Sequence, residues 1–158
     1  MKLIPLTQGY FTKVDNDDFN KFAIYRWFSI KSRNGIRPSR QISVNGKIIQ
    51  IQLSRAIMKF PENMQVDHIN GDTLDNRKCN LRICTPSENS HNRKKSAFNT
   101  SGYKGVSWDK RNKKWRVMIS CNNKQYYLGL FIDKIKAAKK YDIKAKELHK
   151  EFANLNFK

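Results

Sequence analysis

Residues 65–93 set the strongest requirement on the fold, because an acid, an imidazole and several amides stand close together in this short span. Asp67 and His68 are adjacent, Asn80 follows twelve residues after His68, and Asn89 follows nine residues after Asn80. Hard oxygen ligands bind divalent cations, and a neutral imidazole can deprotonate water near neutral pH. A chain that gathers these side chains could carry out metal-assisted hydrolysis.

The phrase Val66-Asp67-His68-Ile69-Asn70-Gly71, followed by Asn80-Leu81-Arg82, resembles the HNH endonucleases, whose ββα-metal motif is strand, long loop, strand and helix. The resemblance implies that His68 is the general base that activates water, and that Asp67 is a metal ligand. It also implies that Asn80 holds the loop so that His68 is oriented. The implied cofactor is one divalent cation, Mg²⁺ with Mn²⁺ as the alternative.

The last position of the motif leaves a choice between three residues. Spacing favours Asn89, on the closing helix, as the second metal ligand, but His91 and Asn92 are close enough to compete. On a helix, Asn89 and Arg93 share one face because they are four residues apart. His91 and Asn92 would point away from Asn89.

The formal net charge of +19 predicts a polyanionic partner, because 32 Lys and Arg face only 13 Asp and Glu among 158 residues. Nucleic acid is the first candidate. An anionic membrane is weaker, since no apolar run approaches the roughly 18 residues of a spanning helix. The N-terminus also lacks the hydrophobic run of a secretion signal.

The three cysteines predict a reducing compartment, because an odd number at irregular spacing does not suit a disulfide framework. Cys79 and Cys84, with His68 or His91, offer a zinc alternative. Structural zinc sites usually have tighter Cys pairs, and Cys121 lies in another segment. We therefore interpret all three as packing residues or incidental thiols.

Residues 1–64 predict a compact β-rich module with two short helices. The expected strands cover residues 10–14, 29–33, 39–44 and 48–51. Turns at Asn34-Gly35 and Asn45-Gly46 would join the last three. A helix is expected within 15–27, capped by Asp15 or Asp17, and a shorter one over 54–60 stops before Pro61. The aromatic stripe of the first helix predicts core residues: Phe19, Phe22, Ala23 and Trp27.

This N-terminal region is similar to the segment that precedes the HNH core in phage and bacterial homing-type nucleases. The similar phrases are Ile4-Pro5-Leu6-Thr7-Gln8-Gly9, Trp27 and Arg55-Ala56-Ile57-Met58. The family usually places His before the Arg of the last phrase, where this chain has Ser54. If that His serves catalysis or DNA contact in the family, we expect this protein to be the weaker nuclease or DNA binder.

Residues 96–102 have linker composition, and residues 103–158 predict a second module. Strands are expected at residues 104–107, 115–121 and 125–130. Asp133 would cap a long helix with apolar residues at three- and four-residue spacing. We expect this helix to cover one face of a three-stranded antiparallel sheet.

The second module resembles the AP2 DNA-binding domain through Tyr103-Lys104-Gly105-Val106, Tyr127-Leu128-Gly129-Leu130-Phe131 and Ala137-Ala138-Lys139-Lys140-Tyr141-Asp142. Alternation along the strands puts one set of side chains against the helix and the other set on the opposite face. The family's DNA-reading positions map onto that opposite face: Lys104, Ser107, Asp109, Arg116, Met118, Ser120, Gln125 and Tyr127. The plant domains have Arg at the counterparts of Ser107, Asp109, Ser120 and Gln125, so their base preference should not transfer.

The sequence thus predicts an α+β protein with a nuclease part at residues 1–95, whose HNH core spans about 62–95, a linker at 96–102 and an AP2-like DNA-binding domain at 103–158. The expected activity is that of a homing-type HNH endonuclease on double-stranded DNA, as a monomer with a dimer as the alternative. We expect it in the cytoplasm of a bacterial or phage-infected cell. Guanidinium groups around the motif are expected to bind phosphate: Arg77, Arg82 and Arg93.

Three alternatives stay open. Asp67 alone could merely cap a turn, since Asn70-Gly71-Asp72 is a good turn in its own right. The protein could be a DNA-binding regulator with an inactive nuclease core. It could also act on RNA, because both polymers carry the same phosphates. The target site, and whether one strand or both are cut, do not follow from the sequence.

Overall fold

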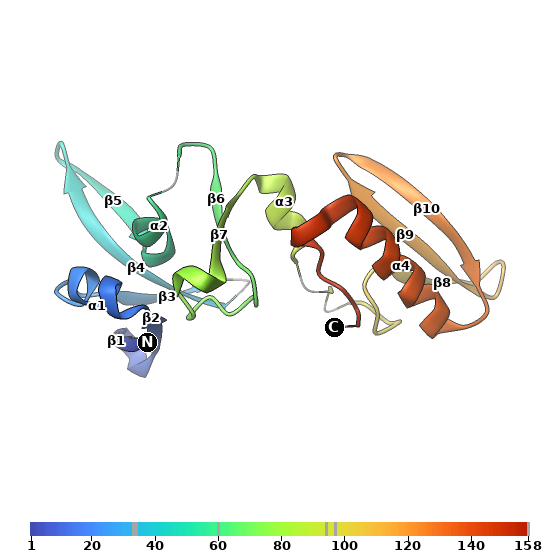
Figure 1. Cartoon of the computed structure of the whole chain (residues 1–158), viewed down its shortest axis with the longest axis horizontal. Helices are drawn as coiled ribbons and strands as arrows, with labels where there is room; N and C mark the ends of the chain where they lie inside the picture. Colours follow the sequence, from blue (N-terminus) through green and yellow to red (C-terminus); the bar gives the residue numbers. More distant parts are fainter. Residues whose placement is uncertain (33–34, 60, 94, 97, 158) are drawn as a thin grey trace. The chain divides into compact units, whose positions relative to one another are not determined.

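The computed structural model describes residues 1–32, 35–59, 61–93, 95–96 and 98–157. The chain divides into two compact units, Met1–Pro86 and Ser87–Lys158. The described residues of the first unit form several small antiparallel sheets and those of the second form one, each with few helices, which is compatible with an α+β fold (Figure 1). No helix in the described part of the chain is long and apolar enough to cross a bilayer.

The first unit contains three small sheets. The strands β1 and β2 form an antiparallel pair, β3, β4 and β5 follow one another in a meander, and β6 pairs with β7 (Figure 1). Their bounds are β1 Lys2–Pro5, β2 Phe11–Val14, β3 Phe28–Ser32, β4 Gly35–Val44, β5 Lys47–Gln52, β6 Gln65–His68 and β7 Leu81–Cys84. The helices are α1 Asn16–Phe22 and α2 Leu53–Met58, with 3-10 turns at Thr7–Gly9 and Lys78–Asn80.

The predicted hairpin at Asn45-Gly46 is confirmed. Val44 pairs with Lys47, and both turn residues have positive φ, 50° and 75°. Such angles match the right-handed twist of the flanking strands. The other predicted turn involves Asn34, which lies outside the described residues, although β3 and β4 pair antiparallel on either side of it.

The helix expected within residues 15–27 is shorter than predicted. It ends at Phe22, and Trp27 lies beyond it, where the indole Nε1 donates to Phe22 O over 2.8 Å. Trp27 is nevertheless 1% exposed, so its predicted place in the core is confirmed. The near-helical spacing of the aromatic residues therefore reflects packing against a shared core rather than one continuous helix.

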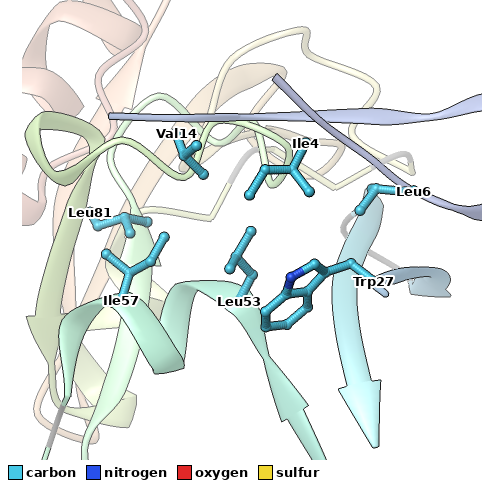
Figure 2. Close-up of a cluster of buried hydrophobic side chains, with 7 residues drawn as sticks. All are labelled: Ile4, Leu6, Val14, Trp27, Leu53, Ile57 and Leu81. Atoms are coloured by element: carbon cyan, nitrogen blue, oxygen red, sulfur yellow. The ribbon is translucent and has the colours of Figure 1, made fainter. Parts of the chain in front are cut away.

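The core of the first unit joins the N-terminal strands to the motif. Figure 2 shows its seven buried side chains, with Leu53 beside the Trp27 ring and Ile57 facing Leu81. They are Ile4, Leu6, Val14, Trp27, Leu53, Ile57 and Leu81. Fully burying one such aliphatic side chain stabilises a fold by about 1.5–3 kcal/mol. Because Leu81 opens β7, this core fixes one strand of the motif.

The elements of the motif follow in the order strand, loop, strand and helix. The strand β6 pairs antiparallel with β7, which places Asp67 opposite Arg82 and His68 opposite Leu81. The helix α3 spans Pro86–His91, and the division between the two units falls after its first residue.

The second unit is a three-stranded antiparallel sheet of order β10-β9-β8 with the helix α4 across one face (Figure 1). Its elements are β8 Val106–Asp109, β9 Lys114–Cys121, β10 Lys124–Phe131, α4 Lys134–His149 and a 3-10 turn at Lys150–Phe152. The buried core consists of Val106, Val117, Ile119, Ala137, Ala138, Tyr141 and Ala145. Asp133 caps α4 as predicted, because its Oδ1 accepts from the amides of Ile135 and Lys136 at 2.6 and 3.0 Å.

The first strand of this sheet begins at Val106 rather than at the predicted residue 104. Gly105 has φ of +74° and packs against Tyr141 so closely that a Cβ would overlap the ring. Glycine suits a position that combines a positive φ with so close a contact, and the strand begins at the next residue. Ser101, at the end of the predicted linker, is buried and donates to Val106 O over 2.8 Å. The linker and the domain boundaries given above stay predictions.

Candidate active site

Asp67 and His68 are the last two residues of β6, so their side chains point to opposite faces of the strand. The Asp67 side chain is buried, with 6% of the residue exposed. Its Oδ2 accepts from Arg82 Nε at 2.9 Å and from Nη2 at 2.7 Å. The pair is a charge-assisted contact across the β6–β7 ladder, and it occupies the guanidinium that we expected to bind phosphate.

His68 contacts the side chain of Asn76, with 3.1 Å between Nε2 and Oδ1. The Asn76 amide nitrogen donates to Thr12 Oγ1 at 2.8 Å and to Thr73 O at 3.2 Å, so its oxygen is the acceptor toward His68. A neutral His68 then carries its proton on Nε2 and its basic lone pair on Nδ1.

The protonation state of His68 suits a base. Burial lowers the pKa of His68 below its ordinary value of 6.5, and the Asn76 hydrogen bond and the charges of Asp67 and Asp72 offset this only in part. The imidazole is therefore neutral at pH 7, in the form that can accept a proton from water.

Asn76 is a site residue that sequence reasoning missed. It is fully buried, and it links the imidazole to Thr12 on β2, 64 residues earlier. Its amide also belongs to the backbone ladder, since Asn76 N donates to Lys13 O over 2.9 Å. An amide beside Asp75 and Arg77 carries no local signal of this role, because its partners lie in another part of the chain.

Asn80 closes the loop between the two strands. Its Oδ1 accepts from Asn70 N at 3.0 Å, its Nδ2 donates to Asp75 O at 2.8 Å, and its carbonyl accepts from Ile69 N at 2.9 Å. The side chain is 6% exposed. These contacts join the start and the middle of the loop, and the role of Asn80 in orienting His68 stays a prediction.

Asp75 and Arg77 stabilise the same loop. Arg77 donates through Nε and Nη2 to the two carboxylate oxygens of Asp75, each over 2.7 Å, and Asp75 is 1% exposed. The hydrogen bonds from Arg77 hold the pKa of Asp75 below its ordinary value, and Asn70 adds another donor at 3.2 Å. Arg77 was expected to bind phosphate, and its guanidinium is bound to this carboxylate.

The candidates for the last motif position lie in the second unit. Asn89 is half-buried on α3. The ring of His91 stacks on His149, with 3.8 Å between centroids and 7° between planes. The Asn92 carbonyl accepts from Asn154 Nδ2 over 2.9 Å. The role of Asn89 as second ligand stays a prediction, as does the effect of Ser54, which is buried on α2.

The sheet face of β8–β10 opposite α4 presents most of the predicted DNA-reading side chains. Val117 and Ile119 are buried toward α4, whereas the flanking Arg116 and Ser120 are exposed. The same face carries Ser107, Asp109, Met118, Gln125 and Tyr127. A bulge after Tyr127 shifts the pairing of β10 by one residue.

Lys104 differs from the other DNA-reading candidates. Its Nζ donates to the carbonyls of His91 and Arg93 at 2.6 and 2.8 Å. Burial lowers the pKa of Lys104 to about 8, and Asp142 opposes this effect. These contacts favour an architectural role for Lys104 and for the Arg93 backbone within the second unit.

Residues 59–91 match the family model described as HNH endonuclease. The chain is 42% identical over 67 residues to Protein 3.8 of Escherichia phage T7, an alignment that covers 42% of this chain and 55% of that protein. It is 28% identical over 155 residues to a protein of Acanthamoeba polyphaga mimivirus called uncharacterized HNH endonuclease L560, covering 94% of this chain and 76% of that protein. Residues 59–91 are thus similar to the HNH endonucleases, the chain has phage and viral relatives, and it aligns with about half the length of the T7 protein.

Proposed function

We propose that this protein is a homing-type DNA endonuclease that hydrolyses a phosphodiester bond with one bound divalent cation. The observation that carries the proposal is the setting of His68: an imidazole that bonds to the buried Asn76 amide, one residue after the buried Asp67, in the segment that matches the HNH endonuclease model.

The donor set suits a hard cation. Asp67 offers carboxylate oxygens and Asn89 an amide oxygen, which are the ligand types that Mg²⁺ and Mn²⁺ prefer. The cation would polarise the phosphate and stabilise the charge that develops on the departing 3′ oxygen. The guanidinium of Arg82 already contacts the Asp67 carboxylate, so cation binding requires the two positive charges to share that group or Arg82 to turn away.

His68 supplies the nucleophile. Its Nδ1 would take a proton from water, and the resulting hydroxide would attack phosphorus. The bond from phosphorus to the 3′ oxygen breaks, that oxygen takes up a proton from solvent, and the imidazolium releases its proton to solvent. The Asn76 side-chain oxygen accepts the hydrogen bond from Nε2–H throughout and would stabilise the imidazolium that forms. Asn80 acts on His68 indirectly, by keeping the loop closed next to β6.

Charge supports duplex DNA as the substrate. Residues 93–124 contain ten Lys or Arg and one acidic residue, Asp109. Basic side chains on a sheet face can neutralise phosphates, and Arg and Gln can distinguish base pairs in the major groove. Arg116 and Gln125 are the exposed candidates for such contacts on β9 and β10.

Plasmid cleavage tests the proposal. Supercoiled plasmid is incubated with Mg²⁺ and either the wild-type protein or His68→Ala, and both proteins are first shown to melt cooperatively and to bind the plasmid equally. Loss of a general base reduces the rate by about 100-fold or more. Equal cutting by the two proteins would refute the assignment of His68. Competition between duplex DNA and structured RNA identifies the preferred polymer.

A second candidate is a DNA-binding protein with an inactive core, and the contact between Arg82 and Asp67 favours it, since a paired carboxylate is a weaker cation ligand. A titration of Mg²⁺ separates the two. A nuclease shows saturable activation of cleavage, whereas the inactive protein binds DNA and leaves the plasmid supercoiled at every concentration.

A further inference from the structure

Three potential metal ligands come together in the second unit, apart from the HNH residues. His91 ends α3, Cys121 ends β9 and His149 ends α4. One ring nitrogen of each histidine and the Cys121 Sγ all lie within 4.8 Å of one another. The three residues are only 9%, 8% and 5% exposed.

The hydrogen bond of His149 determines its tautomer. Its Nε2 lies 3.0 Å from Ser120 O, and a carbonyl can only accept, so Nε2 carries the proton. The lone pair of the neutral ring is then on Nδ1, which is buried and has no hydrogen-bond partner among the described residues. Histidine ligands of metals typically have this arrangement, in which one ring nitrogen donates to a carbonyl and the other faces the ion.

His91 and Cys121 complete a set of nitrogen and sulfur donors. The two imidazoles are stacked, with 3.8 Å between ring centroids and 7° between ring planes. Neutral imidazoles and a thiolate are ligands for zinc rather than for magnesium.

We propose that His91, Cys121 and His149 bind one Zn²⁺ ion, with solvent as the fourth ligand. Bond lengths of about 2.0 Å to nitrogen and 2.3 Å to sulfur put tetrahedral donor atoms about 3.5 Å apart. The three side chains therefore need to draw together by about 1 Å from the widest separation. One imidazole must also turn to another rotamer, out of the stacked arrangement, because an ion lies near the plane of each ring that binds it. Binding would displace the thiol proton to solvent and leave a zinc thiolate.

Such a site would connect three element ends. The helix α3 consists of six residues, too few to be stable alone in water, and His91 would attach its last residue to β9 and α4. Asn89 lies two residues before His91 on the same helix. Zinc would thus order the segment that carries the predicted second ligand of the catalytic cation, while being a different metal in a different coordination environment.

Cobalt substitution tests the site in the full chain. Protein stripped with a chelator is titrated with Co²⁺, and one equivalent per chain is expected to produce a thiolate-to-cobalt absorption band that Zn²⁺ abolishes and Mg²⁺ does not. Cys121→Ser and His149→Asn are expected to lose the band. Cys84→Ser, the matched control with a buried thiol in the first unit, and Cys79→Ser are expected to retain it. A missing band, or one that survives Cys121→Ser, would overturn the proposal.

A measurement on the wild-type chain covers the case in which the variants do not fold. X-ray absorption at the zinc edge, on protein loaded with one equivalent of Zn²⁺, is expected to show one sulfur and two imidazole scatterers. A first shell of oxygen and nitrogen alone, or one with two sulfurs, would contradict this site. Plasmid cleavage with Mg²⁺ is scored separately, so failure of the zinc site and failure of the nuclease proposal are distinguishable.

Discussion

The ring Nε2 of His68 lies 3.1 Å from the side-chain oxygen of Asn76, and this contact decides which imidazole nitrogen can act as a base. Asn76 itself is held by Thr12 Oγ1 and Thr73 O, so its oxygen cannot exchange places with its nitrogen without losing two hydrogen bonds. The N-terminal strand β2 therefore orients the proposed catalytic histidine through one buried amide.

Replacing Asn76 tests this positioning role. Asn76→Ala leaves the Nε2 proton without its acceptor, and we expect cleavage to slow by about 10- to 100-fold, the usual effect of losing a residue that orients a functional histidine. The measurement is single-turnover cleavage below the melting temperature of the variant. Asn20→Ala, an exposed amide on α1, is the matched control. A variant that cuts at the wild-type rate would show that Asn76 serves stability alone.

The pH dependence of cleavage follows from the lowered pKa of His68. The base is active when neutral, so kcat/KM is expected to rise with pH and to level off as the imidazole loses its proton. Because burial lowers the pKa of His68, the inflection should fall below 6.5. The rate on a short duplex, measured from pH 5 to 8 at saturating Mg²⁺, provides the profile. An inflection above 6.5 contradicts the neutral, buried histidine.

Asp75 is expected to stabilise the loop between β6 and β7 through its ion pair with Arg77. Asp75→Asn removes the charge that pairs with Arg77, and because Arg77 is partly exposed we expect a loss of about 2 kcal/mol in the free energy of unfolding. Urea unfolding measures it, with Asp17→Asn on α1 as the exposed control.

Acid should remove the same contribution in the wild-type protein. The folded-state pKa of Asp75 is below its ordinary value, so its stabilisation is present above about pH 4 and is lost as pH falls through the folded pKa. Asp75→Asn should therefore lose less stability than the wild type between pH 4 and 2. Parallel curves for the two proteins would contradict this.

Cation removal should abolish cleavage without releasing DNA. We expect a chelator to stop cutting, and either Mg²⁺ or Mn²⁺ to restore it. Asp67→Asn keeps the shape of the ligand but lowers its charge, so half-activation should require a higher Mg²⁺ concentration. Cleavage rates over a Mg²⁺ series give this value. Unchanged activation in Asp67→Asn would remove Asp67 from the cation site.

The exposed sheet face of the second unit should control affinity. Arg116→Ala is expected to weaken duplex binding and to reduce the slope of log affinity against log salt by about 1, since one phosphate contact is lost. The cleavage rate of bound DNA should stay the same. Fluorescence anisotropy at several salt concentrations measures the slope, with Lys136→Ala on the exposed side of α4 as the matched control. Equal slopes for both variants would argue against this face.

Local features were predictable from the sequence because they depend on neighbours in the chain. Asn45-Gly46 specified a hairpin through its positive φ angles, Asp133 capped the amides that follow it, and alternation along β9 separated buried Val117 from exposed Arg116. The resemblance of residues 59–91 to the HNH endonucleases was recognisable because its sequence motifs are short and continuous.

Tertiary structure alone decided which side chains meet. Asn76 binds Thr12 across 64 residues, and His91 stacks on His149 from another part of the chain. Arg77 and Arg82 looked available for phosphate but are paired with Asp75 and Asp67. Backbone preferences act over a few residues, whereas these partners are selected by burial, where each polar group taken from water needs another within hydrogen-bond distance.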